Sequence, residues 1–300
     1  MQKVRDAANR QGALNVLVLA SVCAGVLSST ARGDETITFY ATAFLPTATT
    51  ITVGETVHFV HSAGSHTVTS GTSSAPSGSP GALFDVELDA TAPLFSYTFN
   101  TPGTYSFFCR DHETGLVGTI VVEPFFVVVG VVNNAFTPED VHVFAGDQVR
   151  WEWIEGLHSV TSGASSAPAD NPGALFDSPL TGAQPVFIHD FTTPGTFPYF
   201  CLPHEAFNMY GSVHVQQLFI RGDTNSDGQI DVADPITLLG HLFLQEPEPA
   251  CTDAADATDD GTLNIADAIL QLSYLFGGGT LPAPFPQAGA DRSSDALYCY

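Results

Sequence analysis

The chain has 300 residues, of which 44% are hydrophobic, and its formal net charge at neutral pH is −24. This length leaves room for two or three domains. The strong negative charge argues against nucleic acids and anionic membranes as binding partners.

Residues 1–31 have the pattern of a secretory signal peptide. Basic residues precede an uncharged apolar run at 13–27, and small residues at 29–31 offer a cleavage site. The run is short for a membrane helix, which needs about 20 residues, and an uncleaved anchor is the alternative. No later segment is apolar over such a length. We therefore expect a secreted, periplasmic or cell-surface protein without a membrane span.

Two segments, 32–123 and 124–217, have β-strand patterns and no helical period. Short runs rich in β-branched and aromatic residues alternate with turns of Gly, Pro and Ser. The predicted strands are 56–60, 95–99, 105–109 and 118–122 in the first segment, and 149–154, 187–191 and 197–201 in the second. Regularly spaced strands of this kind indicate an antiparallel β-sandwich in each segment.

The two segments are copies of one another. Residues 66–85 and 158–177 are identical at 15 of 20 positions, and Thr-Pro-Gly-Thr recurs at 101–104 and 193–196. Repeats of this length are whole domains, because the units of solenoid proteins have shorter periods.

Each copy also repeats a set of metal-ligand residues. The repeated residues are His66, Cys109 and His112 in the first copy, and His158, Cys201, His204 and Met209 in the second. The upstream His precedes the Cys by 43 residues in both. A thiolate, two imidazoles and a weak axial thioether form the ligand set of a blue-copper electron-transfer site. A disulfide between the two cysteines is the alternative, but each Cys has its own His set in register.

With these motifs, both copies resemble cupredoxin domains of the plastocyanin/pseudoazurin type. The resemblance also includes the Gly-Glu/Asp-x-Val strands at 54–57 and 146–149 and the two Cys-x2-His loops. It implies a mainly β protein with two Greek-key sandwiches. Because each Cys ends a predicted strand and its His lies in the next loop, a copper ion would sit at one end of each sandwich.

By this resemblance, the second copy has all four copper ligands. His158, Cys201, His204 and Met209 have the family's Cys-x2-His-x4-Met spacing. The alternatives are zinc on the same residues or a fold that has lost its metal.

The first copy departs from the family pattern at the axial position. It retains His66, Cys109 and His112, but its loop is one residue shorter and Leu116 stands where the family has Met. Leucine cannot ligate a metal. The resemblance implies either a three-coordinate copper site of higher potential or a decayed site, so the protein would bind one or two copper ions.

The sequence argues against an enzyme. Two-domain copper oxidases and nitrite reductases add a second copper centre with His-x-His pairs and a His beside the Cys. Phe108 and Phe200 precede the two cysteines, and no His-x-His occurs. An oxidase with an unrecognised site is a weaker alternative. The remaining histidines are expected on the surface or on strand faces: His58, His61, His142, His189, His214 and His241.

From residue 219 onward, two Asp-rich loops appear, each followed by an apolar-periodic helix. Each loop has oxygen-bearing side chains at positions 1, 3, 5, 9 and 12 and a Gly at position 6, as calcium loops do. The candidate ligands are Asp223, Asn225, Asp227, Gln229, Asp231 and Asp234 in the first loop, and Asp256, Thr258, Asp260, Thr262, Asn264 and Asp267 in the second. A solvated turn is the alternative for a single loop, but two in register predict two calcium ions.

Residues 218–300, with this loop pair, resemble a type I dockerin domain, a small α-helical module. The resemblance implies folding on calcium and a cohesin partner, although positions 232–233 and 265–266 lack the hydroxyl pair that some dockerins use. Cys251 and Cys299 remain for a disulfide in an oxidising compartment.

Taken together, these motifs predict a secreted one-electron copper carrier, tethered through its calcium module, with an unknown redox partner. A non-redox scaffold or copper-storage protein is the alternative.

Overall fold

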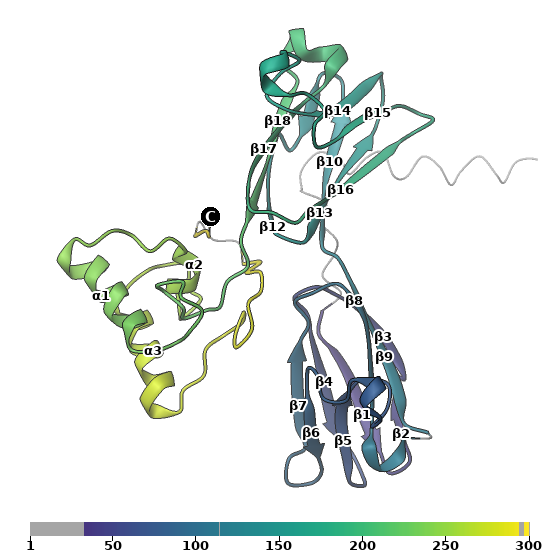
Figure 1. Cartoon of the computed structure of the whole chain (residues 1–300), viewed down its shortest axis with the longest axis vertical. Coiled ribbons are helices and arrows are strands. Elements are labelled where there is room, and N and C mark those ends of the chain that lie inside the picture. The colour runs from purple at the N-terminus through teal and green to yellow at the C-terminus, as the bar shows by residue number, and fades with distance from the viewer. Residues whose placement is uncertain (1–32, 114, 294–296, 300) are drawn as a thin grey trace, which may run out of the picture.

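The computed structural model describes residues 33–113, 115–293 and 297–299 (Figure 1). The predicted signal peptide, 1–31, lies outside these residues. Two β-domains follow one another along the long axis of the molecule, and a helical module lies beside them (Figure 1). Among the described helices, none has the length and apolar character needed to cross a membrane.

The first domain is a sandwich of two sheets. Its four-stranded sheet has the order β2-β1-β4-β7, and its five-stranded sheet has the order β3-β9-β8-β5-β6. Its strands are β1 (Glu35–Tyr40), β2 (Ala43–Leu45), β3 (Ala48–Thr52), β4 (Thr56–His61), β5 (His66–Ser70), β6 (Asp85–Leu88), β7 (Leu94–Thr98), β8 (Gly103–Phe108) and β9 (Val117–Glu123). Alternate side chains enter a single core rich in phenylalanine, because successive residues of a strand face opposite sides.

The second domain repeats this topology strand for strand. Its sheets have the orders β11-β10-β13-β16 and β12-β18-β17-β14-β15. Its strands are β10 (Phe126–Val132), β11 (Ala135–Thr137), β12 (Asp140–Phe144), β13 (Asp147–Trp153), β14 (His158–Ser162), β15 (Asp177–Leu180), β16 (Val186–Phe191), β17 (Gly195–Phe200) and β18 (Tyr210–Gln216). Trp151 takes a central place in its core and is fully buried.

The prediction of a mainly β chain with two sandwiches is confirmed, with two differences in detail. Each sandwich is mixed, because β1 pairs with β4 and β3 with β9 in parallel, as do their counterparts in the second domain. Cys109 and Cys201 each follow the last residue of a strand and do not lie within it. Short 3-10 segments, too short to produce a helical period, interrupt the loops: η1 (Pro76–Gly78), η2 (Arg110–His112), η3 (Pro168–Asp170) and η4 (Leu202–Phe207), which is kinked at His204.

The C-terminal module has helices α1 (Ala233–Leu244), α2 (Thr252–Ala255) and α3 (Ile265–Gly277). A capping box starts α3, in which the Asn264 side chain accepts from the Ala266 N–H and Asp267 accepts from the Asn264 N–H. A small core of Leu238, Ala255 and Ala268 holds the three helices together. The short α2 had no signal in the sequence.

The module packs against the second domain through a separate apolar cluster. Phe144 of the domain packs there with Phe219, Ala254 and the disulfide between Cys251 and Cys299. The Gln217 N–H donates to the Cys299 carbonyl at 3.1 Å. The chain terminus is thereby held against the end of β18.

Candidate metal centres

The candidate site of the second domain lies where three elements meet at one end of the sandwich. His158 begins β14, Cys201 follows β17 and His204 belongs to η4. Pairing of β14 with β17 at Thr161 and Phe200 brings the His and the Cys together across the sheet. These residues are far apart in sequence, so only the folded sheet makes them neighbours.

The distances in this group suit a single small metal ion. Cys201 Sγ lies 3.7 Å from Nδ1 of His158 and 3.3 Å from Nδ1 of His204. Ligands bound about 2.0 Å and 2.3 Å from one ion at near-tetrahedral angles are about 3.5 Å apart. The three side chains therefore fit around one ion with little movement.

The outer ring nitrogen of the buried His158 makes a hydrogen bond to the backbone. Nε2 of His158 lies 2.9 Å from the Glu155 carbonyl, which can only accept a hydrogen bond. Nε2 therefore carries the proton, and the Nδ1 lone pair faces Cys201. Such an outer hydrogen bond is how proteins orient a ligating histidine.

Burial shifts the pKa values of Cys201 and His158. It raises the pKa of the Cys201 thiol, although the Ser159 N–H, 3.4 Å from Sγ, favours the thiolate. It lowers the pKa of His158, keeping that imidazole in the neutral form that binds metals. A bound cation would offset the cost of the buried thiolate.

Met209, the residue predicted for the axial position, is buried. Its carbonyl accepts a 3.0 Å hydrogen bond from the Cys201 N–H, which holds the two residues side by side. His204 is only partly buried, whereas His158 and Cys201 are buried. His204 is thus the member of the group at the protein surface.

The first domain builds the same arrangement despite its shorter loop. Cys109 Sγ lies 3.8 Å from Nδ1 of His66 and 3.4 Å from Nδ1 of His112. Nε2 of His66 faces the Ala63 carbonyl at 3.0 Å. Leu116 is buried, and its carbonyl accepts from the Cys109 N–H at 3.0 Å, as that of Met209 does in the other site. The missing residue has not displaced the three ligand atoms.

In each site, a side-chain hydroxyl of the strand that carries the upstream His accepts a hydrogen bond from the backbone just after the Cys. Sequence reasoning missed this contact. Thr67 Oγ1 accepts from the Arg110 N–H at 2.8 Å, and Ser159 Oγ accepts from the Leu202 N–H at 2.9 Å. The signal was in the repeat itself, where the residue after each upstream His is a hydroxyl residue in both copies.

Among the described residues, two groups of His, Cys, Asp or Glu side chains place three ligand atoms within 4.8 Å of one another, and they are the two groups just described. Of the remaining histidines, His61 lies near the first group, because its Nε2 is 2.8 Å from the carbonyl of Gly64, two residues before His66. His142 and His214, which stand alone in the sequence, face each other on β12 and β18, with ring centroids 4.7 Å apart.

The two Asp-rich loops share one internal hydrogen-bond pattern. In each loop, the carboxylate at position 1, Asp223 or Asp256, accepts from the N–H groups of positions 5 and 6. The carboxylate at position 12, Asp234 or Asp267, accepts from the N–H groups of positions 3 and 9. Both position-12 side chains are fully buried, and this burial raises their pKa. A cation in each loop would favour the ionised form.

A buried arginine that the sequence did not single out joins the second loop to the tail. Arg221 is fully buried and donates to the Asp256 carbonyl at 2.6 Å and to the Asp291 carboxylate at 2.5 Å. This charge holds one end of the loop against the C-terminal segment.

Comparison with known proteins places both sandwiches in one family. Residues 34–123 and 127–216 each match the copper binding proteins of the plastocyanin/azurin family. The chain therefore belongs to the plastocyanin/azurin family of copper-binding proteins. The predicted resemblance of both copies is confirmed, whereas that of 218–300 to a dockerin stays a prediction.

Single relatives match one domain's length. The plastocyanin of Prochlorothrix hollandica is 44% identical over 88 residues, which are 28% of this chain and 66% of that protein. The plastocyanin of Scenedesmus fuscus is 38% identical over 87 residues, 28% of this chain and 89% of that protein. A solved structure of a mutant fern plastocyanin is 29% identical and covers 30% of this chain and 99% of its own, with a TM-score of 0.26.

Proposed function

We propose that the protein is an exported one-electron carrier that binds copper through His158, Cys201, His204 and Met209. The observation that carries this proposal is the convergence of one thiol and two Nδ1 atoms within 3.3–3.7 Å in a domain of a copper-binding family. A copper ion bound there would cycle between Cu(I) and Cu(II).

Each proposed ligand would have its own role in electron transfer. Buried Cys201 would provide the covalent path to the metal, and the two neutral imidazoles suit both oxidation states. Met209 would tune the reduction potential from the axial position. His204, at the surface, would be the route by which electrons enter and leave. No residue pattern or described cluster supplies a second, catalytic copper, so the proposed role is that of a carrier.

We extend the proposal to the first domain. His66, Cys109 and His112 would hold a second copper, with Leu116 leaving the axial position without a ligand. The support is that the ligand distances agree between the two sites within 0.1 Å.

The test is copper stoichiometry and visible absorption of the full chain after loading with Cu(II). We expect two copper ions and an intense thiolate-to-copper band that each of Cys109→Ser and Cys201→Ser reduces in part. A band lost wholly in Cys201→Ser and unchanged in Cys109→Ser would leave one carrier domain. Bound copper without reversible voltammetry would favour the storage or scaffold role.

For residues 218–300 we propose a calcium-dependent tether of the dockerin type. The support is the matching bond pattern of the two loops and an exposed apolar surface on the helices. The exposed residues are Val232, Ile236, Phe243 and Leu244 around α1, and Ile265, Ile269 and Phe276 around α3. A cohesin or a similar module would cover this surface in an extracellular or cell-surface assembly.

Calcium titration of the full chain tests the tether. All described α-helices lie in this module, so circular dichroism at 222 nm reports on it. We expect two calcium ions to bind and a chelator to lower the melting temperature of the helical signal. An unchanged melting curve in the chelator would contradict the calcium role, and a cohesin that fails to bind the calcium-loaded chain would contradict that partner.

A further inference from the structure

The two copper sites lie at opposite ends of the molecule. In Figure 1, η4 and β14 lie at one extreme of the long axis, and β5 and β6 lie at the other, with the domain junction between them. We call the end with His66, Cys109 and His112 head 1, and the end with His158, Cys201 and His204 head 2.

Strands that start at the junction end at the heads. Pro102 lines a small cavity at the junction, and β8 runs from there to Cys109 in head 1. Asp147 lines the same cavity, and β13 runs from it to Trp153, whose indole N–H donates to the Gly156 carbonyl, two residues before His158. Each path is about seven residues at roughly 3.3 Å per residue, so the heads are on the order of 40 Å apart.

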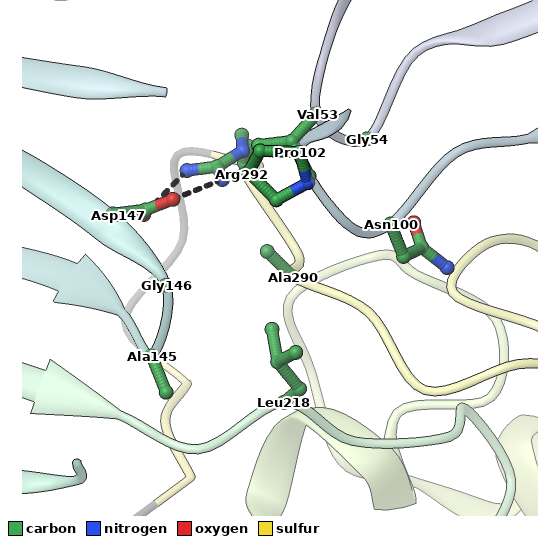
Figure 2. Close-up of a pocket in the computed structure, with 10 residues that line it drawn as sticks. All are labelled: Val53, Gly54, Asn100, Pro102, Ala145, Gly146, Asp147, Leu218, Ala290 and Arg292. Atoms are coloured by element: carbon green, nitrogen blue, oxygen red, sulfur yellow. Dashed lines mark hydrogen bonds and ion pairs between the residues drawn. The ribbon is translucent and has the colours of Figure 1, made fainter. Parts of the chain in front are cut away.

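A C-terminal segment, residues 287–292, contacts both domains, and we call it the strap. Arg292 of the strap makes a bidentate ion pair with the buried Asp147 at 2.7 and 2.9 Å (Figure 2). The same guanidinium lies 3.8 Å from the ring centroid of Phe125, the linker residue that packs against both domain cores. At its other end, Gln287 accepts from the Tyr97 hydroxyl of the first domain at 3.0 Å. The strap therefore contacts both domains and the linker.

The heads also differ in the surface around their exposed histidine. The residue after the Cys is Arg110 in head 1, where it pairs with Asp85, and it is the exposed Leu202 in head 2. Head 2 adds the exposed Phe207, in a loop one residue longer than that of head 1. A glutamate follows the histidine in both heads, Glu113 and Glu205, so head 2 differs from head 1 by its two added apolar side chains and by the lack of an arginine.

From these observations we propose that the protein is a rigid two-headed carrier. Its two copper sites do not exchange electrons within one molecule, so each head exchanges electrons with partner proteins independently of the other. The physical reason is that electron tunnelling through protein weakens steeply with distance, while the strap prevents the heads from approaching each other. This inference rests on the proposed copper binding. In each transfer one electron passes between a head and a partner protein, Cu(II) being reduced as the partner is oxidised, or the reverse.

The geometry is tested without copper. Nitroxide labels are placed in head 1 at Gly115→Cys and in head 2 at Phe207→Cys, both exposed positions, in a chain with Cys109→Ser and Cys201→Ser. Pulsed electron paramagnetic resonance measures the distance between the labels. We expect one narrow distribution centred on the order of 40 Å or longer. A short distance, with the heads side by side, would overturn the proposal.

The strap is tested in the same labelled chain with Arg292→Met. We expect a broader distance distribution, because the ion pair with Asp147 and the contact with Phe125 are lost together. Arg150→Met is the matched control, since Arg150 pairs with Glu152 on its own strand. A distribution that stays equally narrow in both variants would show that the strap does not hold the domains.

The electron-transfer claim is tested on the copper-loaded chain. A reductant pulse delivers less than one electron per molecule, and the redistribution between the two visible bands is followed in time. We expect the rate to double when the protein concentration doubles, because electrons pass only between molecules. A rate independent of concentration would overturn independent heads. A chain without any blue band would instead overturn the proposed function, while the label distances would still decide the geometry.

Discussion

Leu116 and Met209 occupy equivalent positions in the two sites, and both carbonyls accept a bond from the neighbouring Cys N–H. This backbone contact is the same at both positions, and the side chain predicted for the axial position differs between the two sites. A thioether donates weakly to Cu(II), whereas leucine offers nothing.

Exchanging the axial residues should therefore move the two potentials in opposite directions. We expect Met209→Leu to raise the potential of its site and Leu116→Met to lower that of the other. The expected shift is about 60 mV or more, a tenfold change in a one-electron equilibrium. Voltammetry of each single variant measures it, and unchanged potentials would mean that neither side chain faces the metal.

Gly118 provides a residue-scale test of the first domain. A Cβ on Gly118 would lie 2.4 Å from the ring of the buried Phe107, whereas one on Gly115 would meet nothing within 4 Å. We expect Gly118→Ala to destabilise the domain by about 1–3 kcal/mol through overpacking. Gly115→Ala, the matched control, should change stability by less than about 0.5 kcal/mol. Calorimetry compares the two, and equal melting temperatures would contradict the packing described for β9.

At the scale of elements, β12 and β18 bring together two histidines. His142 and His214 are register partners on parallel strands, and their rings stack at 17°. Loss of water around the stacked ring lowers the pKa of His142. The neighbouring His214 lowers this pKa further, whereas Asp140 raises it.

Titration of His142 by nuclear magnetic resonance tests this arrangement. We expect its pKa to lie below the usual 6.5. His214→Gln should raise it, because one source of positive charge and of burial is removed. Asp140→Asn should lower it, because a favourable carboxylate is lost. Shifts of the opposite sign in these variants would show that the strands do not pair in this register.

At the scale of the whole molecule, a disulfide joins the C-terminal segment to the helical module beside the second domain. The Cys251–Cys299 disulfide closes a 48-residue separation and lies in the apolar cluster shared with Phe144 of the second domain. Replacing both cysteines with alanine should destabilise the module by about 2–4 kcal/mol.

Circular dichroism and tryptophan fluorescence measure the unfolding of the module and of the second domain separately in this variant. Circular dichroism at 222 nm reports on the module, and the two tryptophans, Trp151 and Trp153, report on the second domain. We expect the helical transition to move to lower temperature and the fluorescence transition to move less. A helical transition at the original temperature would contradict a stabilising role for the disulfide.

The sequence by itself determined the repeat, the fold class and the ligand sets to be tested. Local signals sufficed there, because His66 and His158 precede their cysteines by one spacing and the strands alternate with Gly and Pro turns. The metal-ligand assignments of both sites and of the calcium-type loops remain predictions that the geometry supports.

Only the tertiary structure decided how these parts face one another. The pairing of His142 with His214, the burial of Arg221 and the ion pair of Arg292 with Asp147 join residues up to 145 positions apart. Such contacts leave no periodic pattern in a sequence, because they depend on which strands pair and on how distant segments pack against one another. The opposite placement of the two heads depends on that packing, and so does any division of labour between them.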